Sequence, residues 1–300
     1  MKKLLFLIFL LQSFLFGTVT EPLAFEIGSG YREDHLKWLI SSDTPDSQLN
    51  YKERYKHPRY LQTNASLRVI DRDIYFFGNF AYSFFASSQM HQKDRDIILY
   101  SFDFKNHGYD LESALELGYA VNLTPDHMEK TILIPLFGYS GFWKILKRED
   151  STPTYEQNGA AVSSVLDKRL KQVWFGPYLG VNLEFIPCDR VIFDLGYHFN
   201  WLKLKHKSTS DLQIGLIDNY KIIDAALDAH SHAAFGKITY VFTEKFKLAF
   251  MGKYDYFISE DKTKVNFVTK AQNIDSDVYK NNFFSRWWYV FLGLEFIFQY

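Results

Sequence analysis

Hydrophobic and polar residues alternate along many stretches of the chain. Between Leu111 and Leu123 the odd positions are mostly apolar, whereas the even positions are small or polar and include Glu112 and Glu116. A period of two places successive side chains on opposite faces of a β-strand. Such stretches are long enough to cross a bilayer at a tilt. The pattern therefore predicts membrane-crossing strands with one apolar and one polar face.

The pattern and its spacing indicate ten strands, at residues 23–31, 61–69, 74–85, 111–123, 132–143, 173–185, 191–202, 234–242, 246–256 and 287–300. Their connections alternate between short (70–73, 124–129, 186–190 and 243–245) and long, polar ones (41–58, 87–108, 145–170, 203–228 and 258–285). Short periplasmic turns and long extracellular loops are typical of outer-membrane barrels. The predicted fold class is all-β, a ten-stranded antiparallel up-and-down transmembrane β-barrel with both termini on the periplasmic side.

The first residues have the composition of a signal peptide. Lys2 and Lys3 precede an apolar run from Leu4 to Leu11, and the small Gly17 follows. The run is too short for a membrane-spanning helix, which needs about 20 residues. We expect cleavage after Gly17 or Thr20. This divides the chain into a signal peptide at 1–20 and an outer-membrane β-barrel at 21–300, and predicts localisation in the outer membrane.

The last strand ends in alternating aromatic residues, Phe296, Phe298 and Tyr300. This ending resembles the closing strand that the outer-membrane assembly machinery recognises, although that pattern most often ends in Phe. A soluble edge strand with such exposed aromatics would be prone to aggregation. The expected partners are therefore outer-membrane lipid and the assembly machinery, which would bind the C-terminal strand.

Composition supports an envelope protein and excludes some other classes. The chain has 29 Phe, 20 Tyr and 6 Trp, although its mean hydropathy is only −0.20. Lipid-facing surfaces and interfacial belts explain so many rings. The 34 basic and 35 acidic residues nearly cancel, so no nucleic-acid partner is indicated. Cys188 is the single cysteine, which excludes an intramolecular disulfide and a thiolate-rich metal site.

With lipid outside, the alternation predicts many charged side chains inside the barrel. These lumen-facing residues are Glu26, Arg68, Glu112, Glu116, Glu184, Asp194, His198, Lys237, Lys253, Asp255 and Glu295. A ring of ten strands encloses a narrow bore, which disfavours a wide, water-filled porin. Unpaired charges in such a bore are costly unless they are hydrated. We expect either an internal network of ion pairs or a narrow path for a small solute.

Motifs for metal or nucleophile chemistry are sparse. The sequence has no HExxH, GxSxG, P-loop or CxxC motif, so we expect no cofactor and no metal. His230 and His232 share one strand face close to Asp228, a spacing that a metal site would also use. Solvated side chains at the margin of a loop are the more common explanation for such a pair.

Four short segments resemble the outer-membrane protein family of the environmental chlamydiae, the Protochlamydia type. They are Gly30–Trp38, Tyr109–Ala114, Pro135–Ser140 and Trp174–Val181. The resemblance implies a surface-exposed barrel, and some relatives are regarded as porins.

Ten strands also resemble the omptin barrels, which are outer-membrane proteases. In that family an aspartate pair and an Asp-x-His pair activate water across the extracellular mouth. The matching candidates here are Asp94 and Asp96, with Asp228 and His230. Charged loops contain such pairs by chance, so ordinary solvated charge is the competing explanation.

The sequence thus predicts an integral outer-membrane surface barrel, either a narrow pore or a structural and recognition barrel. An omptin-like endopeptidase and an adhesin that acts through its long loops are the alternatives. The possible ligand is an extracellular partner or a small solute.

Overall fold

The computed structural model describes residues 19, 21–42, 50–94, 98–104, 106–124, 129–148, 156–157, 160–161, 168–214, 217–265 and 279–300. The predicted signal peptide lies outside these residues, apart from Val19. No helix in the described part of the chain has the length and apolarity needed to cross a bilayer.

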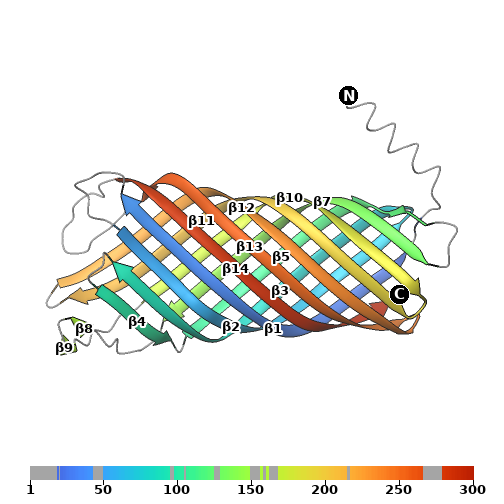
Figure 1. Ribbon diagram of the computed structural model, residues 1–300, viewed down its shortest axis with the longest axis horizontal. Helices are drawn as coiled ribbons and strands as arrows, with labels where there is room; N and C mark the ends of the chain where they lie inside the picture. Colours follow the sequence, from blue (N-terminus) through green and yellow to red (C-terminus); the bar gives the residue numbers. More distant parts are fainter. Residues whose placement is uncertain are drawn as a thin grey trace, which may run out of the picture.

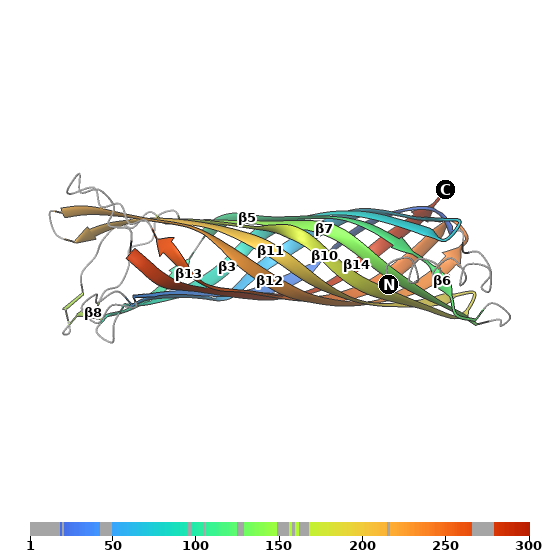
Figure 2. The ribbon, with the colours of Figure 1, turned by 90° about the horizontal axis from the view of Figure 1, so that it is seen from above.

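Ten long antiparallel strands form a closed barrel, elongated along its axis (Figures 1 and 2). They are β1 (Glu21–Ser42), β2 (Asn50–Asp71), β3 (Ile74–Asp94), β5 (Asn106–Tyr119), β7 (Lys130–Arg148), β10 (Lys168–Cys188), β11 (Val191–Ile214), β12 (Ile217–Thr243), β13 (Phe246–Val265) and β14 (Tyr279–Gln299). The short strands are β4 (Ile98–Phe104), β6 (Val121–Asn122), β8 (Glu156–Gln157) and β9 (Ala160–Ala161). The predicted fold class is confirmed.

The first and last strands close the ring. Strand β1 pairs with β14 from Ala24 opposite Gln299 to Ser42 opposite Asn281, and β7 pairs with β10 to complete the circle. Hydrocarbon offers no partner for an unpaired backbone N–H or C=O group, so a spanning sheet must have no free edge. The start of β1 and the end of β14 lie at the end of the barrel that carries the short turns (Figure 1).

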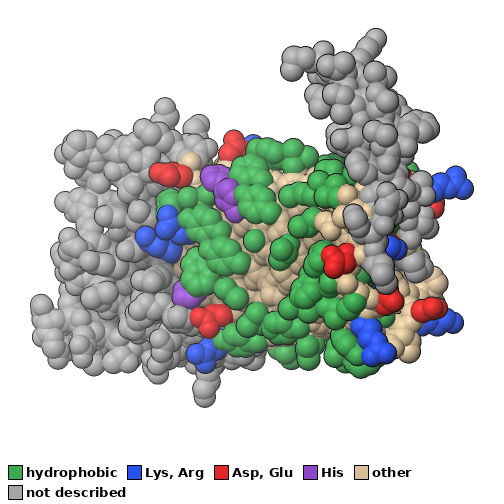
Figure 3. All heavy atoms as spheres, turned by 45° about the vertical axis from the view of Figure 1, so that its right-hand side comes forward, with side chains coloured by type: hydrophobic (Ala, Val, Ile, Leu, Met, Phe, Trp, Pro, Cys, Tyr) green, Lys and Arg blue, Asp and Glu red, His purple; other side chains and the backbone are tan. Residues whose placement is uncertain are grey.

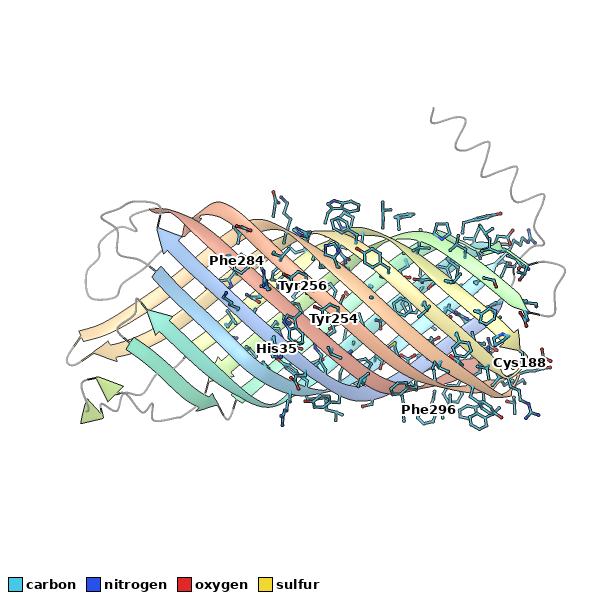
Figure 4. The ribbon with its side chains drawn as sticks, viewed as in Figure 1. His35, Cys188, Tyr254, Tyr256, Phe284 and Phe296 are labelled. Carbon is cyan, nitrogen blue, oxygen red and sulfur yellow. The ribbon has the colours of Figure 1, made fainter. Side chains whose placement is uncertain are left out.

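The two faces of each strand differ as the alternation predicts. On β5, Leu115 and Leu117 are 60% and 44% exposed, whereas Glu112 and Glu116 are 3% and 4% exposed. On the face shown in Figure 3, hydrophobic side chains cover much of the middle of the barrel in a band, and charged side chains lie on either side of it. Aromatic residues lie within this band, as Tyr254, Tyr256 and Phe296 illustrate (Figure 4).

The band is as tall as a bilayer requires. On β11 the outward residues run from Val191 to Trp201, and the next outward residue is the exposed Lys203. A transmembrane strand needs about nine to eleven residues. On β1 the corresponding boundary lies at Tyr31, which is followed outward by Glu33.

The strands continue far beyond this band, which differs from the loop lengths expected from the sequence. The predicted loop 203–228 is mostly a paired hairpin, because β11 reaches Ile214 and β12 starts at Ile217. Likewise β4 pairs with β3 inside the predicted loop 87–108. The physical reason is that no lipid contacts these extensions. The outward positions are therefore polar: on β11 the exposed Lys203, Lys205 and Lys207 alternate with the buried Leu202 and Leu204, so the alternation of the band is inverted while the backbone pairing continues.

A tight turn joins β2 to β3 at the end of the barrel with the short connections. Arg72 and Asp73 both have positive φ angles, 47° and 71°, as a two-residue type I′ hairpin turn requires. The Asp73 carboxylate accepts the Val19 backbone N–H, and the Asp73 N–H donates to the Val19 carbonyl. The buried Val19 is thereby fixed against the end of the barrel.

The lipid-facing role of the outer surface is tested by placing a charge in it. We expect Leu195→Arg to destabilise the folded barrel in vesicles by about 2–4 kcal/mol, because it places a guanidinium in hydrocarbon. Denaturant titration followed by tryptophan fluorescence measures the change. Lys203→Arg, eight residues along β11 at an outward position beyond the band, is the control and should leave stability unchanged. Equal stability of both variants would show that residue 195 does not contact lipid.

Candidate functional site

The structure places all eleven predicted lumen-facing side chains on the wall of one interior cavity. Glu112, Glu184 and Asp194 are 3%, 1% and 8% exposed, so none of them faces the exterior. The interior is organised along the barrel axis into three parts: an outer plug, a central cavity and an inner ion network.

The outer plug is a layer of charged and aromatic side chains level with the extracellular edge of the lipid band. Its members are Arg32, Asp34, Tyr60, Asp110, Glu112, Phe142, Lys144, Trp174, Lys253, Asp255, Phe257, Trp287 and Tyr289. They come from β1, β2, β5, β7, β10, β13 and β14, so the plug joins opposite walls of the barrel.

Arg32 is the centre of the plug and is fully buried. Its Nε donates to Asp34 Oδ1 at 2.7 Å, its Nη2 donates to Asp110 Oδ2 at 2.9 Å, and its Nη1 donates to Glu112. Charge-assisted bonds from a planar guanidinium are among the strongest side-chain hydrogen bonds. Strands β1 and β5 are separated in the ring by β2 and β3, so Arg32 reaches across the bore.

Lys144 is a second buried cation in the plug. Its Nζ donates to Asp34 and Asp110, at 2.5 Å each, and to the Tyr60 hydroxyl at 3.2 Å. The same Nζ lies 4.7 Å from the Trp287 ring centroid. Desolvated cation–π contacts of this kind strengthen the packing of rings around a charge.

Aromatic rings fill the space between these ions. Trp287 stacks on Phe257 with centroids 4.3 Å apart, and Trp174 lies 5.5 Å from Phe257. Phe142 meets Phe257 edge to face at 4.8 Å. The Trp287 Nε1–H donates to Asp34 Oδ2 at 2.9 Å, which ties the rings to the ions.

Lys253 connects the plug to the cavity beneath it. Its Nζ lies 2.9 Å from Asp255 Oδ2 and 3.3 Å from Glu112 Oε2, and it donates to the Tyr289 hydroxyl at 2.8 Å. The Tyr289 hydroxyl donates in turn to Glu112 Oε2 at 2.9 Å. Glu112 is therefore shared between Arg32 and Lys253.

The inner ion network lies nearer the periplasmic end. Arg68 donates to Glu184 at 2.8 Å and to Glu21 at 2.7 Å. Lys237 donates to Glu26 at 3.1 Å and lies 3.6 Å from Glu295. Asp194 completes the network, 3.9 Å from Arg68.

Between the two ionic layers lies a central cavity of about 130 Å³. Glu116 accepts hydrogen bonds from Tyr178 at 2.7 Å and from Tyr75 at 3.3 Å. Gly138 allows this arrangement, because a Cβ there would overlap the Tyr178 ring. Each water needs about 10–15 Å³ of such volume and several polar partners, so the cavity is large enough for roughly ten waters.

Carboxylates outnumber cations in both ionic layers. In the plug Arg32, Lys144 and Lys253 oppose Asp34, Asp110, Glu112 and Asp255. In the inner network Arg68 and Lys237 oppose Glu21, Glu26, Glu184, Asp194 and Glu295. Buried charge is stable only when it is paired, hydrogen-bonded or hydrated. The interior therefore favours water and positive charge over anions.

Two of the four omptin-like candidates, Asp228 and His230, have described side chains, and neither faces the barrel mouth. Asp228 is 73% exposed in its side chain and pairs with Lys203 on the outer surface. His230 is also exposed, opposite the outward Trp201, and stacks on Phe199 at 6.1 Å. The reason is parity, because the inward residues of β12 are the odd-numbered ones. The Asp94 side chain and Asp96 lie outside the described residues.

His230 and His232 do share one strand face, with ring centroids 5.9 Å apart. No group of three or more metal-ligating side chains occurs among the described residues. His232 instead meets the outward Tyr197, whose hydroxyl lies 2.7 Å from His232 Nδ1.

The most important plug residues are missing from the lumen set that the sequence predicts. Arg32 and Asp34 lie just beyond the predicted strand 23–31, and Asp110 lies just before 111–123. Even-numbered residues of β1 face the lumen, as Glu26 does. Extending that alternation toward the extracellular end would have identified Arg32 and Asp34 as lumen-facing. The signal was hidden because the outward residues Glu33 and His35 are also polar there.

The C-terminal aromatics point outward at the periplasmic edge of the band. Phe296, Phe298 and Tyr300 are 46%, 37% and 82% exposed. Their recognition by the assembly machinery stays a prediction.

The energetic role of the plug is tested by removing its central cation. We expect Arg32→Met to destabilise the barrel by about 3–5 kcal/mol, because it leaves Asp34, Asp110 and Glu112 partly uncompensated in a buried site. Equilibrium unfolding in urea measures the loss. Arg59→Met, at an exposed outward position on β2, is the matched control. An equal effect of both substitutions would contradict a buried, stabilising role for Arg32.

Comparison with solved structures finds matches that differ widely in how well they superpose. The E. coli outer membrane protease OmpT superposes with a TM-score of 0.71 at 11% identity, covering 95% of this chain and 98% of that one. The P. putida toluene transporter TodX gives a TM-score of 0.35 at 10% identity, covering 96% and 91%. No curated protein sequence matches the chain. At these identities the OmpT likeness shows the fold alone.

The sequence family gives a more specific result. The family described as "Protochlamydia outer membrane protein" matches residues 26–289, which include eight of the ten barrel strands in full, most of β1, about half of β14, and nearly all of the plug and networks. The chain therefore belongs to the Protochlamydia outer membrane protein family, and it is an outer-membrane β-barrel.

Proposed function

We propose that this chain is a closed surface barrel, which anchors an extracellular recognition structure in the outer membrane and does not conduct solutes in its resting state. The main observation in favour of a closed barrel is the burial of the outer plug. Arg32, Lys144, Trp174, Phe257, Trp287 and Tyr289 are each no more than 1% exposed. Their rings and ions contact one another across the bore, so the plug obstructs the outer end of the narrow path expected from the sequence.

The proposed role in extracellular recognition rests on the length of the strands. From Trp201 to Ile214, β11 extends about 40 Å along the strand beyond the lipid band, at ~3.3 Å per residue. Strand β12 returns in register over the same distance. A paired hairpin of this length is not needed to cross the bilayer. The extension therefore supports a role in recognition over a purely structural role of the barrel in the membrane.

A planar-bilayer measurement tests closure. We expect the wild-type barrel to be electrically silent, and the triple variant W174A/F257A/W287A to conduct ions, because the substitutions remove the rings that fill the outer bore. Trp288→Ala is the control, since Trp288 follows Trp287 but stacks on His35 at the outer surface. It should remain silent. Steady conductance of the wild type would overturn closure and favour the narrow-pore alternative.

Shortening one hairpin tests recognition. The Lys207–Asp224 pair lies in register, so replacing residues 208–223 with Asn-Gly should close β11 and β12 with a two-residue turn. We expect this variant to keep the heat-resistant mobility of a folded barrel but to lose attachment of protein-displaying cells to host-cell surfaces. Undiminished attachment would contradict a role for this hairpin, and loss of heat resistance would show that the extension serves folding.

A further inference from the structure

A basic patch lies on the outer surface of β10 and β11, directly above the aromatic edge of the lipid band. The outward residues above Phe175 on β10 are Val173, Lys171 and Arg169, and those above Trp201 on β11 are Lys203, Lys205 and Lys207. The five basic residues are all exposed, whereas Val173 is apolar and partly buried. We propose that this basic patch binds the phosphorylated headgroup of a glycolipid in the outer leaflet.

The strand register concentrates positive charge at one point. Lys171 lies directly opposite Lys207, and Lys205 is the next outward residue on β11. Residues directly opposite in an antiparallel pair have Cβ atoms about 4.5–5.5 Å apart, and diagonal neighbours lie about 7–8 Å apart. Like charges in these positions repel each other and destabilise the sheet. A phosphate between the three ammonium groups would reverse this repulsion.

Nearby acidic residues offset only part of this excess, since Asp224 of β12 lies opposite Lys207 in the strand register and no acidic residue lies opposite Lys205. Lys203 is paired with Asp228 of β12, which leaves Lys171, Lys205 and Lys207 without that carboxylate. Lys205 Nζ lies 5.3 Å from the Phe175 ring centroid, so its stem covers an aromatic residue at the edge of the band. A lipid bound here would place its phosphate among the lysines and its acyl chains against Phe175 and the outward residues below it.

The position of the patch favours a lipid over a soluble anion. The patch begins where the apolar band ends, which is the plane of the headgroups in the outer leaflet. Clusters of Lys and Arg next to a membrane attract anionic headgroups, and each residue strengthens binding severalfold. A phosphate monoester carries up to two charges and presents several acceptor oxygens, which suits three lysines at neighbouring register positions.

Native mass spectrometry of the purified full barrel tests the proposal. Micelles would contain either an acylated diglucosamine bisphosphate, its dephosphorylated form or phosphatidylethanolamine. We expect the wild type to retain only the bisphosphate lipid, and K171Q/K205Q/K207Q to lose roughly tenfold or more of that retention. The control K130Q/R190Q/K245Q removes equal charge from exposed sites at the periplasmic end and should retain the lipid like the wild type.

Two further measurements separate the explanations. Added inorganic phosphate should not displace the lipid, and displacement would identify a soluble-anion site and overturn the proposal. Lys171→Glu places a carboxylate opposite Lys207, so it should raise thermal stability while it abolishes lipid retention. Unchanged retention in this variant or in the triple variant, or equal loss in the control, would also overturn the proposal.

Discussion

The pairing of β1 with β14 is the interaction on which the rest of this structure depends. It removes the free sheet edge, and without it a row of backbone N–H and C=O groups would remain unpaired in hydrocarbon. Closure also fixes the two environments that the side chains experience. Every outward residue of the band then faces lipid, and every inward residue shares one narrow, enclosed space.

That narrow space explains the composition of the interior. Ten strands leave too little room for bulk water around each charged group, so the charges must satisfy one another. Arg32 does this most fully, since it bonds to carboxylates from β1 and β5 at once. The aromatic rings of Trp287 and Phe257 exclude the remaining water around it. Such a plug holds opposite walls together and closes the bore with the same side chains.

The outer surface follows the same constraint at its edges. Where the apolar band ends, charged residues begin, and the cations gather on β10 and β11 more than the carboxylates do. The extracellular extensions are free of the lipid requirement, so outward positions such as Lys203, Lys205 and Lys207 are polar while the backbones stay paired. The lipid band, the outer plug and the extracellular extensions therefore occupy successive levels along the barrel axis.

The sequence by itself determined the strands within the band, the outward and inward parity of each, and the short turns at one end. Lipid on one side and an enclosed interior on the other impose a period of two that is visible without coordinates, as in Leu115 beside Glu116. It did not determine the ends of the extensions, because outside lipid the outward positions become polar, as at Lys203 and Lys205, and no longer follow the pattern of the band. Nor did it determine which inward charges meet. Arg32 contacts Glu112 across 80 residues of sequence, and only ring closure and strand stagger bring them to one level.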